Sequence, residues 1–238
     1  MIQGIRSFVF TLFMFFSALV WGMFICIFIW PFSISTRLRV ARSWSRTQIT
    51  ALRLICGLSY SVSGVENIPS QGRHVIMCKH SSAWETIALQ LIFPDQSWVL
   101  KRELLWVPFI GWAMGLCRPI AIDRKAGRLA VRTVIEQGKD RLKHSQWIVI
   151  FPEGTRVAPF ERKRFGISGA LLAVEADALV VPVAHNAGLF WRRRGFLKRA
   201  GTIEVVIGKP ITTSGRDPKD VIEEAQLFVD DHTSALGA

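Results

Sequence analysis

The sequence predicts an α/β fold in which helices flank a central mixed sheet, preceded by an N-terminal membrane-embedded helical segment. After about residue 60, short β-branched runs alternate with longer helical stretches, the pattern of helices packed on a central sheet. From Ser7 to Thr36 no charged residue appears, and this run exceeds the roughly 20 residues that span a bilayer. A chain of 238 residues accommodates one substantial domain and such an appendage.

The apolar segment has a rival interpretation as a secretory signal peptide. The apolar part of a signal peptide is usually about 7–15 residues long and ends near a small-residue cleavage site, which this longer run does not match. Gly22 and Pro31 also permit a bent arrangement, in which two short helices dip into one leaflet. The sequence leaves spanning and dipping open.

Basic residues flank the apolar segment unequally. Only Arg6 precedes it, whereas four arginines follow it: Arg37, Arg39, Arg42 and Arg46. The positive-inside tendency therefore places the following domain on the cytoplasmic side, at the inner membrane if the source is bacterial. The stretch from Arg37 to Arg53, with Trp44, suits the headgroup layer, although an ordinary solvated helix is the alternative. We divide the chain into an anchor with an interfacial basic helix, residues 1–58, and a sheet domain, residues 59–238.

The rest of the chain supplies the elements of the sheet domain. Six runs are predicted strands: Val75–Met77, Trp98–Leu100, Ile120–Ile122, Trp147–Ile150, Leu179–Val181 and Ile203–Ile207. Two long stretches are predicted helices, Ala126–His144 and Asp217–Asp230, and the second opens with a capping Asp and a Pro. A shorter helical run covers Thr86–Phe93.

Composition limits the partners. The net charge of +12 favours anionic lipid surfaces, nucleic acid or phosphorylated small molecules. Base-stacking aromatics in a recognisable nucleic-acid module are missing, so we expect no nucleic-acid partner. The four cysteines lack metal-site or disulfide spacing, and we expect no metal and a reducing setting.

One polar motif follows a predicted strand. In Lys79-His80-Ser81-Ser82-Ala83-Trp84-Glu85, His80 lies where the strand ends, the usual place for ligands in α/β sheets. Five positions on a regular helix separate His80 from Glu85 by about 140°, so the two meet only if a turn precedes the helix. Ser81 or Ser82 is a plausible N-cap for that helix. A His paired with a carboxylate can act as a general base, although a structural histidine is the alternative.

A second motif, Phe151-Pro152-Glu153-Gly154-Thr155-Arg156, follows another predicted strand. Gly154 permits close approach of a ligand to the main chain. Thr155 can donate a hydrogen bond, and Arg156 can hold two phosphate oxygens with its planar guanidinium. The motif is therefore a candidate phosphate site, with a surface β-turn as the alternative.

Together the two motifs resemble the glycerophosphate acyltransferase superfamily, specifically the bacterial 1-acyl-glycerol-3-phosphate acyltransferases. The resemblance covers roughly residues 60 to 210, because Ala121–Arg124 and Val181–Ala184 match further blocks of the family in the same order. Lys79 stands where the family commonly has Asn, and Glu85 where it commonly has Asp. The role of the charge that Lys79 brings is left open.

The resemblance implies roles for these residues. His80 would deprotonate the acceptor hydroxyl and Glu85 would orient His80. The acceptor phosphate would be held by a basic and polar set: Lys101, Arg124, Glu153, Gly154, Thr155 and Arg156. The substrates implied are lysophosphatidic acid and acyl-CoA or acyl-ACP, with acyl carrier protein as a possible partner and no cofactor. The Trp106–Trp112 stretch would either shape an acyl-chain groove or pack beneath it.

Three alternatives stay open at this point. An acyltransferase of the same family could use another lysolipid acceptor. A serine hydrolase could use Ser81 or Ser82, although no Gly-x-Ser-x-Gly elbow is present. A membrane-tethered binding protein could use the basic run Trp191–Arg199 to hold anionic lipid.

Overall fold

The structure, a computed structural model, describes residues 1–144 and 146–237 and confirms the predicted α/β class. Its sheet has seven strands in the order β1-β7-β6-β2-β5-β3-β4. The strands are β1 Leu58–Ser63, β2 Val75–Cys78, β3 Gln96–Lys101, β4 Ile120–Ile122, β5 Trp147–Ile150, β6 Val180–His185 and β7 Gly201–Ile207. Only the β6–β7 pairing is antiparallel among these neighbours, so the sheet is mixed as predicted.

All six predicted strands are present, and the strand that the sequence did not predict is β1. It pairs only with β7 at the edge of the sheet. Its sequence, Leu-Ser-Tyr-Ser-Val-Ser, alternates polar and larger residues and is only partly buried. An edge strand of this kind lacks the continuous apolar run that marks a buried parallel strand.

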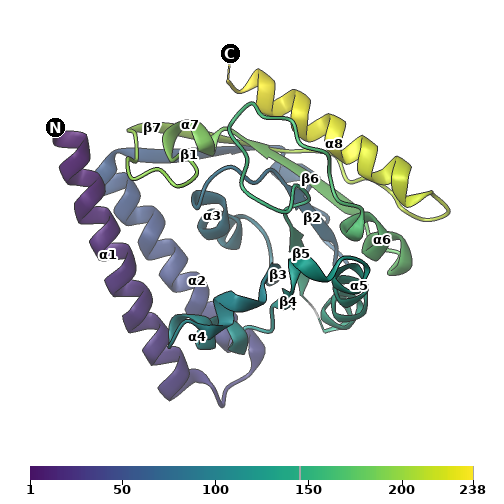
Figure 1. Ribbon diagram of the computed structural model, residues 1–238, viewed down its shortest axis with the longest axis horizontal. Helices are drawn as coiled ribbons and strands as arrows, with labels where there is room; N and C mark the ends of the chain where they lie inside the picture. Colours follow the sequence, from purple (N-terminus) through teal and green to yellow (C-terminus); the bar gives the residue numbers. More distant parts are fainter. Residues whose placement is uncertain (145, 238) are drawn as a thin grey trace.

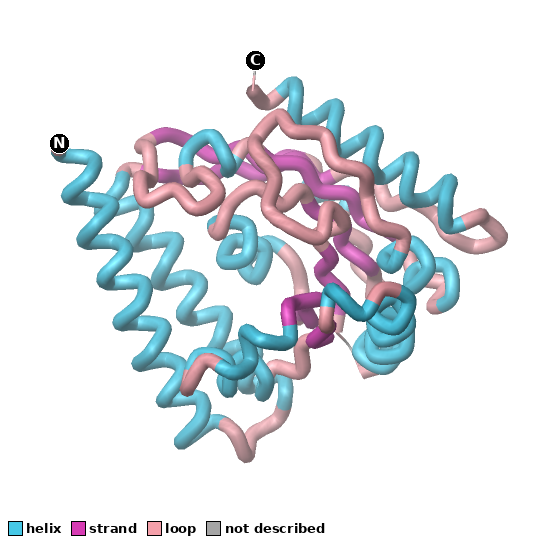
Figure 2. The backbone as a smooth tube through the Cα atoms, viewed as in Figure 1, coloured by secondary structure: helices cyan, strands magenta, loops and turns pink. Residues whose placement is uncertain are grey.

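The helices cover both faces of the sheet (Figures 1 and 2). The α-helices are α1 Ile2–Phe24, α2 Ile34–Ala51, α3 Trp84–Ile92, α4 Ile110–Leu116, α5 Arg128–Lys143, α6 Ser168–Glu175, α7 Ala187–Phe190 and α8 Pro218–Ala235. Two π-helical turns, η1 Ile25–Ile29 and η2 Leu52–Cys56, extend α1 and α2, and η3 Val65–Asn67, η4 Arg102–Trp106 and η5 Arg124–Ala126 are 3₁₀ turns. The predicted helices at Ala126–His144 and Asp217–Asp230 are α5 and α8, and Asp217 caps α8 as expected.

The core is divided by the sheet. Alternate β2 residues, Ile76 and Cys78, face a cluster with α1, α2 and α3, whereas Val75 and Met77 face one with α5, α6 and α8. All four are completely buried. The central strand is thus enclosed on both faces, which makes its end a rigid base for the residues that follow it.

The N-terminal segment forms a helical hairpin. One continuous helix, Ile2–Ile29, is the only one in the described residues that is long and apolar enough to cross a membrane. The chain then reverses around Pro31 and returns as α2. Many large apolar side chains of α1 are exposed, among them Phe8, Phe15 and Phe16, and this indicates membrane association.

The hairpin is fixed to the sheet domain at both ends of α1. Near its start, Lys198 Nζ donates to Thr11 Oγ1 at 2.6 Å and lies 4.9 Å from the Trp191 ring centroid. Near its end, Gly22 lies against the main chain of Phe109, leaving 3.1 Å for an added Cβ. Between them, Gln48 Nε2 donates to Ser17 Oγ at 2.8 Å. The helix therefore follows the domain along its length (Figure 1).

The structure corrects the predicted headgroup role of two residues in α2. Trp44 does not face the lipid interface: its Nε1 donates to Ser17 Oγ at 3.2 Å, and the ring packs against the core. Arg42 forms an ion pair of 3.0 Å with Asp95. The sequence pattern missed this because α2 is covered by α1 and α3. Arg39, Arg46 and Arg53 are exposed and stay available for lipid contact.

Close packing of η4 on α4 depends on Gly111. A Cβ at this position would lie 2.7 Å from the carbonyl carbon of Leu105, whose main chain cannot move aside. We expect Gly111→Ala to lower the free energy of unfolding by about 1–3 kcal/mol, measured by thermal or chemical denaturation in detergent micelles. Gly115→Ala in the same helix is the matched control, because a Cβ there meets nothing within 4 Å. Equal stability of the two variants would contradict this packing.

Candidate active site

Four of the predicted site residues lie at one edge of the sheet. Strands β2, β3, β4 and β5 run parallel in the sheet, so their carboxyl ends share this edge. His80 follows β2, Lys101 ends β3, Arg124 follows β4 and Arg156 follows β5. The topology brings together residues that are up to 76 positions apart, from His80 to Arg156.

His80 and Glu85 meet as the inferred turn requires. His80 Nδ1 lies 2.9 Å from Glu85 Oε1, and both side chains are nearly or fully buried. The same oxygen accepts hydrogen bonds from the main-chain N–H of Ser81 at 3.0 Å and of Ser82 at 2.8 Å. Helix α3 begins at Trp84, whose N–H donates to Ser82 Oγ at 3.2 Å. Glu85 thus closes the turn that brings it to His80.

The environment of the pair fixes its tautomer. Burial raises the pKa of Glu85, but the hydrogen bond from His80, the neighbouring histidines and the Ser82 N–H together outweigh burial and leave that pKa lowered. An ionised Glu85 makes Nδ1 the donor, so Nε2 is the ring nitrogen left to accept a proton. The Phe151 ring stacks on His80 with centroids 4.0 Å apart and fixes the plane of the imidazole.

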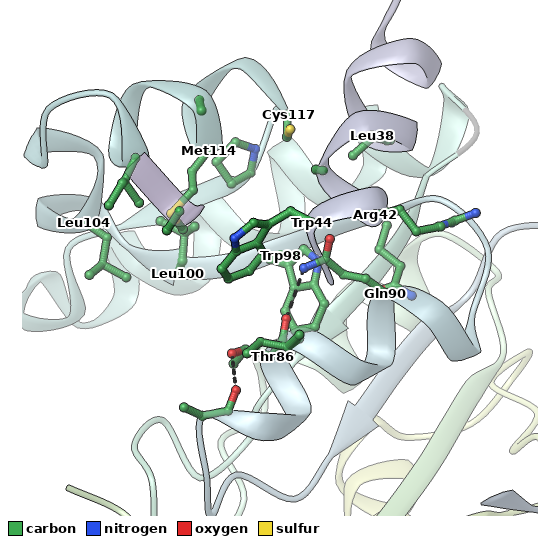
Figure 3. Close-up of a pocket in the computed structure, with 18 of the residues that line it drawn as sticks. Leu38, Arg42, Trp44, Thr86, Gln90, Trp98, Leu100, Leu104, Met114 and Cys117 are labelled. Atoms are coloured by element: carbon green, nitrogen blue, oxygen red, sulfur yellow. Dashed lines mark hydrogen bonds between the residues drawn. The ribbon is translucent and has the colours of Figure 1, made fainter. Parts of the chain in front are cut away.

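His80 lines a cavity of about 440 Å³ between the sheet edge and the N-terminal helices. Most of the wall is apolar and comes from α1, α2, α3, α4 and β3. Figure 3 shows part of this wall, including Leu38, Trp44, Trp98, Leu100, Leu104 and Met114. The wall also includes four basic or titratable residues near the sheet edge: His80, Lys101, Arg124 and Arg156. A ligand with one anionic group and a long apolar part fits this division.

Two guanidinium groups share the polar part of the cavity. Arg124 donates from a terminal nitrogen to the carbonyl oxygen of Gly154 at 2.6 Å. Burial lowers the pKa of Arg124, Glu103 opposes this, and the like charge of Arg156 lowers it further. The Nε of Arg156 is buried without an acceptor among residues 1–144 and 146–237. Two neighbouring cations with an unused donor suit a phosphate group.

The structure places the other predicted phosphate residues differently. Glu153 is 3% exposed and does not line the cavity; its carboxylate accepts from the His80 main-chain N–H at 3.2 Å and lies 3.5 Å from Lys79 Nζ. Burial raises the pKa of Glu153 to about 7, with Lys79 opposing the rise. Gly154 and Thr155 also lie outside the cavity wall, and Gly154 acts through its carbonyl, at a φ of +68° that favours glycine.

Lys101 lies at the cavity wall, whereas Ser81 and Ser82 lie outside it. Lys101 is exposed and forms an ion pair of 3.1 Å with Glu103 at the cavity wall. Ser81 and Ser82 are buried and do not line the cavity. A nucleophilic serine beside His80 is therefore disfavoured.

His185 lies directly against the pair. Its Nε2 is 2.9 Å from the Lys79 carbonyl oxygen and 3.9 Å from Glu85 Oε2, and its Nδ1 accepts from Ala187 N–H at 3.2 Å. Burial lowers the pKa of His185, with Glu85 opposing, so a neutral ring donates from Nε2. Its place at the end of β6 was the available sequence signal.

The aromatic stretch Trp106–Trp112 contributes to the cavity through its centre. Ile110 lines the wall together with Ala113 and Met114. Trp106 and Trp112 point outward and are 67% and 51% exposed. They do not form the groove, and their exposure makes them candidates for lipid contact.

The chain is similar to several known proteins. A family model described as Acyltransferase matches residues 59–186. The chain is 44% identical over 224 residues to a 1-acyl-sn-glycerol-3-phosphate acyltransferase of Pseudomonas aeruginosa, covering 93% of this chain and 86% of that protein. Human 1-acyl-sn-glycerol-3-phosphate acyltransferase alpha is 28% identical over 183 residues, which are 74% of this chain and 63% of the human protein.

A solved structure has the same fold. The crystal structure of the 1-acyl-sn-glycerophosphate acyltransferase PlsC from Thermotoga maritima matches with a TM-score of 0.81 at 21% identity. The match covers 99% of this chain and 98% of that chain, so it includes the N-terminal helices as well as the sheet.

The hydrogen bonds to Glu85 should make the free energy of unfolding depend on pH. A carboxyl whose pKa is lowered in the folded state adds stability that is complete above its unfolded pKa and is lost as pH falls through the folded value. For Glu85, with an ordinary pKa of 4.5, Glu85→Gln should lower the free energy of unfolding at pH 7 by about 1.5–3 kcal/mol. The difference from the unmodified protein should shrink as the pH falls below 4.5, followed by urea denaturation.

The matched control for this substitution is Glu136→Gln, at an exposed carboxylate paired with Arg132 on α5. Its effect on the free energy of unfolding should stay within about 0.5 kcal/mol. A Glu85→Gln variant as stable as this control at pH 7 would contradict the assignment of the hydrogen bonds.

Proposed function

The chain belongs to the acyltransferase family, and we propose that it transfers a fatty acyl group from an acyl thioester to the sn-2 hydroxyl of 1-acyl-sn-glycerol-3-phosphate, giving phosphatidic acid. The observation that carries this proposal is the 2.9 Å contact of Glu85 with His80, which lines a cavity together with Arg124 and Arg156. A proton acceptor, an anion site and an apolar space are the three parts that this reaction needs.

His80 acts as the general base. Its Nε2 takes the proton of the acceptor hydroxyl while Glu85 stabilises the imidazolium that forms. The hydroxyl oxygen attacks the thioester carbonyl, and the tetrahedral oxyanion collapses with cleavage of the C–S bond. The thiolate leaves with little need for protonation help and then takes the proton from His80. No covalent acyl-enzyme forms on this route.

The cavity divides the substrates between its polar and apolar parts. Arg124 and Arg156 hold the phosphate of the acceptor near His80, and Lys101 adds positive charge at the rim. The apolar wall from α1, α2, α4 and β3 receives an acyl chain. Acyl-CoA and acyl carrier protein thioesters both present the same carbonyl group, and we include both as donors.

We place the enzyme on one leaflet of a bacterial inner membrane, with the catalytic domain on the cytoplasmic side. Contacts at both ends of α1 support this arrangement, because a helix fixed along the domain cannot leave it to cross the bilayer alone. Its exposed apolar face enters the leaflet. Exposed arginines of α2 and of the loop between α7 and β7, including Arg192, Arg193 and Arg194, are available to anionic lipid headgroups.

Removal of the base should abolish transfer in a folded protein. We expect His80→Ala to reduce turnover by at least about 10²–10⁴-fold, measured as free thiol release together with phosphatidic acid formation. Near-normal transfer by this variant would rule out the mechanism. Thiol release without lipid product in the unmodified protein would instead favour a hydrolase.

Loss of one guanidinium should weaken phosphate binding selectively. Arg156→Ala should raise KM for lysophosphatidic acid by about 10- to 100-fold, the range of hydrogen bonds to charged groups, without the same effect on a 1-acylglycerol acceptor. Arg156→Lys should restore only part of the affinity for lysophosphatidic acid, because an ammonium group lacks the planar fork of a guanidinium. Arg128→Ala, at an exposed arginine outside the cavity wall, is the control, and equal KM changes in Arg128→Ala and Arg156→Ala would contradict the site.

The one-leaflet arrangement puts both chain ends on the same side. With the native cysteines replaced by serine, Ile2→Cys and Ser234→Cys, both at exposed positions, should react with a membrane-impermeant maleimide only after spheroplasts are lysed. Labelling of Ile2→Cys alone in intact spheroplasts would show a spanning helix.

A further inference from the structure

Lys79 is a buried cation behind the cavity, and the proposed mechanism does not use it. Its side chain is 1% exposed, and its Nζ donates to the main-chain oxygen of Glu161 at 2.9 Å. Two carboxylates share the same ammonium group: Glu153 Oε1 at 3.5 Å and Asp230 Oδ1 at 3.9 Å. A buried charge needs such compensation. Lys79 therefore connects the loop after β5 to the C-terminal helix α8.

Glu153 extends this connection to the main chain of His80. Both Glu153 oxygens lie within 3.4 Å of the His80 nitrogen. Glu153 is thus held between the ammonium of Lys79 on one side and the residue that carries the imidazole on the other. A change in its charge alters both the position of His80 and the electrostatic potential around it.

Asp230 completes the chain of contacts from α8. One of its oxygens, Oδ2, accepts from Gln226 Nε2 at 3.2 Å. The other, Oδ1, is buried and has no hydrogen-bond donor in the part of the chain that the structure describes, so Lys79 is its nearest recorded cation. The neighbouring Asp231 is exposed and pairs with Arg162 at the surface.

We propose that Asp230 and Lys79 are positioning residues for His80: Asp230 shares the Lys79 ammonium with Glu153, and Glu153 holds the main chain of His80 and sets the charge behind it. The proposal rests on the proposed role of His80 in acyl transfer. It assigns a part in the active site to a residue of α8 that lies 150 positions after His80.

Loss of the charge on Asp230 and loss of the charge on Lys79 shift the ionisation of Glu153 in opposite directions. Burial already raises the pKa of Glu153 to about 7, so its charge responds to small changes near neutral pH. Loss of the Asp230 charge leaves Lys79 to Glu153 alone and favours the ionised form of Glu153. Loss of the Lys79 charge favours the neutral form. Lys79 and the main chain of His80 contact Glu153 directly, and the Cys78 thiol is within reach of its charge. Three further titratable groups are linked to it through these residues: Asp230 of α8 through Lys79, and Glu85 of α3 with His185 of β6 through His80.

The test is the pH dependence of kcat with both substrates saturating. The acid limb follows the ionisation of Glu153, because the ionised carboxylate is the form that holds the main-chain N–H of His80. Asp230→Asn should therefore move the limb to lower pH, and Lys79→Asn should move it to higher pH, each by about 0.5 to 1 unit. Asp231→Asn, the same substitution at the next residue, should leave the profile unchanged. If the substitutions only loosened the packing of α8, the Asp230 and Lys79 variants would not shift the pH profile in opposite directions.

If Lys79→Asn does not fold, Lys79→Asn/Asp230→Asn replaces it, because it leaves no unpaired Asp230 charge. This double variant should also shift the limb to higher pH, since Glu153 has lost its ammonium partner. An Asp230→Asn profile identical to that of Asp231→Asn, or shifted in the same direction as the Lys79 variant, overturns the inference. Failure of the unmodified protein to transfer acyl groups would overturn the proposed function instead, so the two failures are distinguishable.

Discussion

The carboxylate of Glu85 accepts three N–H groups at one oxygen, from the His80 ring and from the main chain of Ser81 and Ser82. These bonds form only because the chain turns between β2 and α3, and they also hold that turn closed. The direction of the imidazole, the start of α3 and the turn that follows β2 are therefore fixed by a single buried group. Its cost of burial is offset by these three hydrogen bonds to the charged form at Oε1.

The sheet gives this pair its chemical setting. Parallel strands β2, β4 and β5 end at one edge, and the residues after them supply a base and two guanidinium groups. The N-terminal helices close the space above that edge with apolar side chains. The N-terminal helices and the sheet domain thus line the same cavity. In the proposed function, the phosphate end of the lysolipid lies near His80 and the acyl chains lie in apolar surroundings.

Much of this could be predicted from residue patterns. The six apolar runs, the capped helix at Asp217 and the meeting of His80 with Glu85 follow from local periodicity and turn chemistry. Long-range packing decided the rest. The pattern did not find β1, because an edge strand needs little apolar surface. The pattern predicted that Glu153 contacts the phosphate and that Trp44 lies at the lipid interface. Local sequence does not show that another element buries a side chain. Asp230 could not be associated with His80, since only the packing of α8 brings them together.

The direct-attack route is tested most directly by mixing an excess of enzyme with an acyl thioester in the absence of any acceptor and following free thiol within one turnover. No burst of thiol is expected, because the acceptor hydroxyl that His80 activates is absent. Addition of lysophosphatidic acid should then release thiol and phosphatidic acid in equal amounts. A thiol burst stoichiometric with enzyme before the acceptor is added would reveal a covalent acyl-enzyme and contradict direct attack by the acceptor hydroxyl.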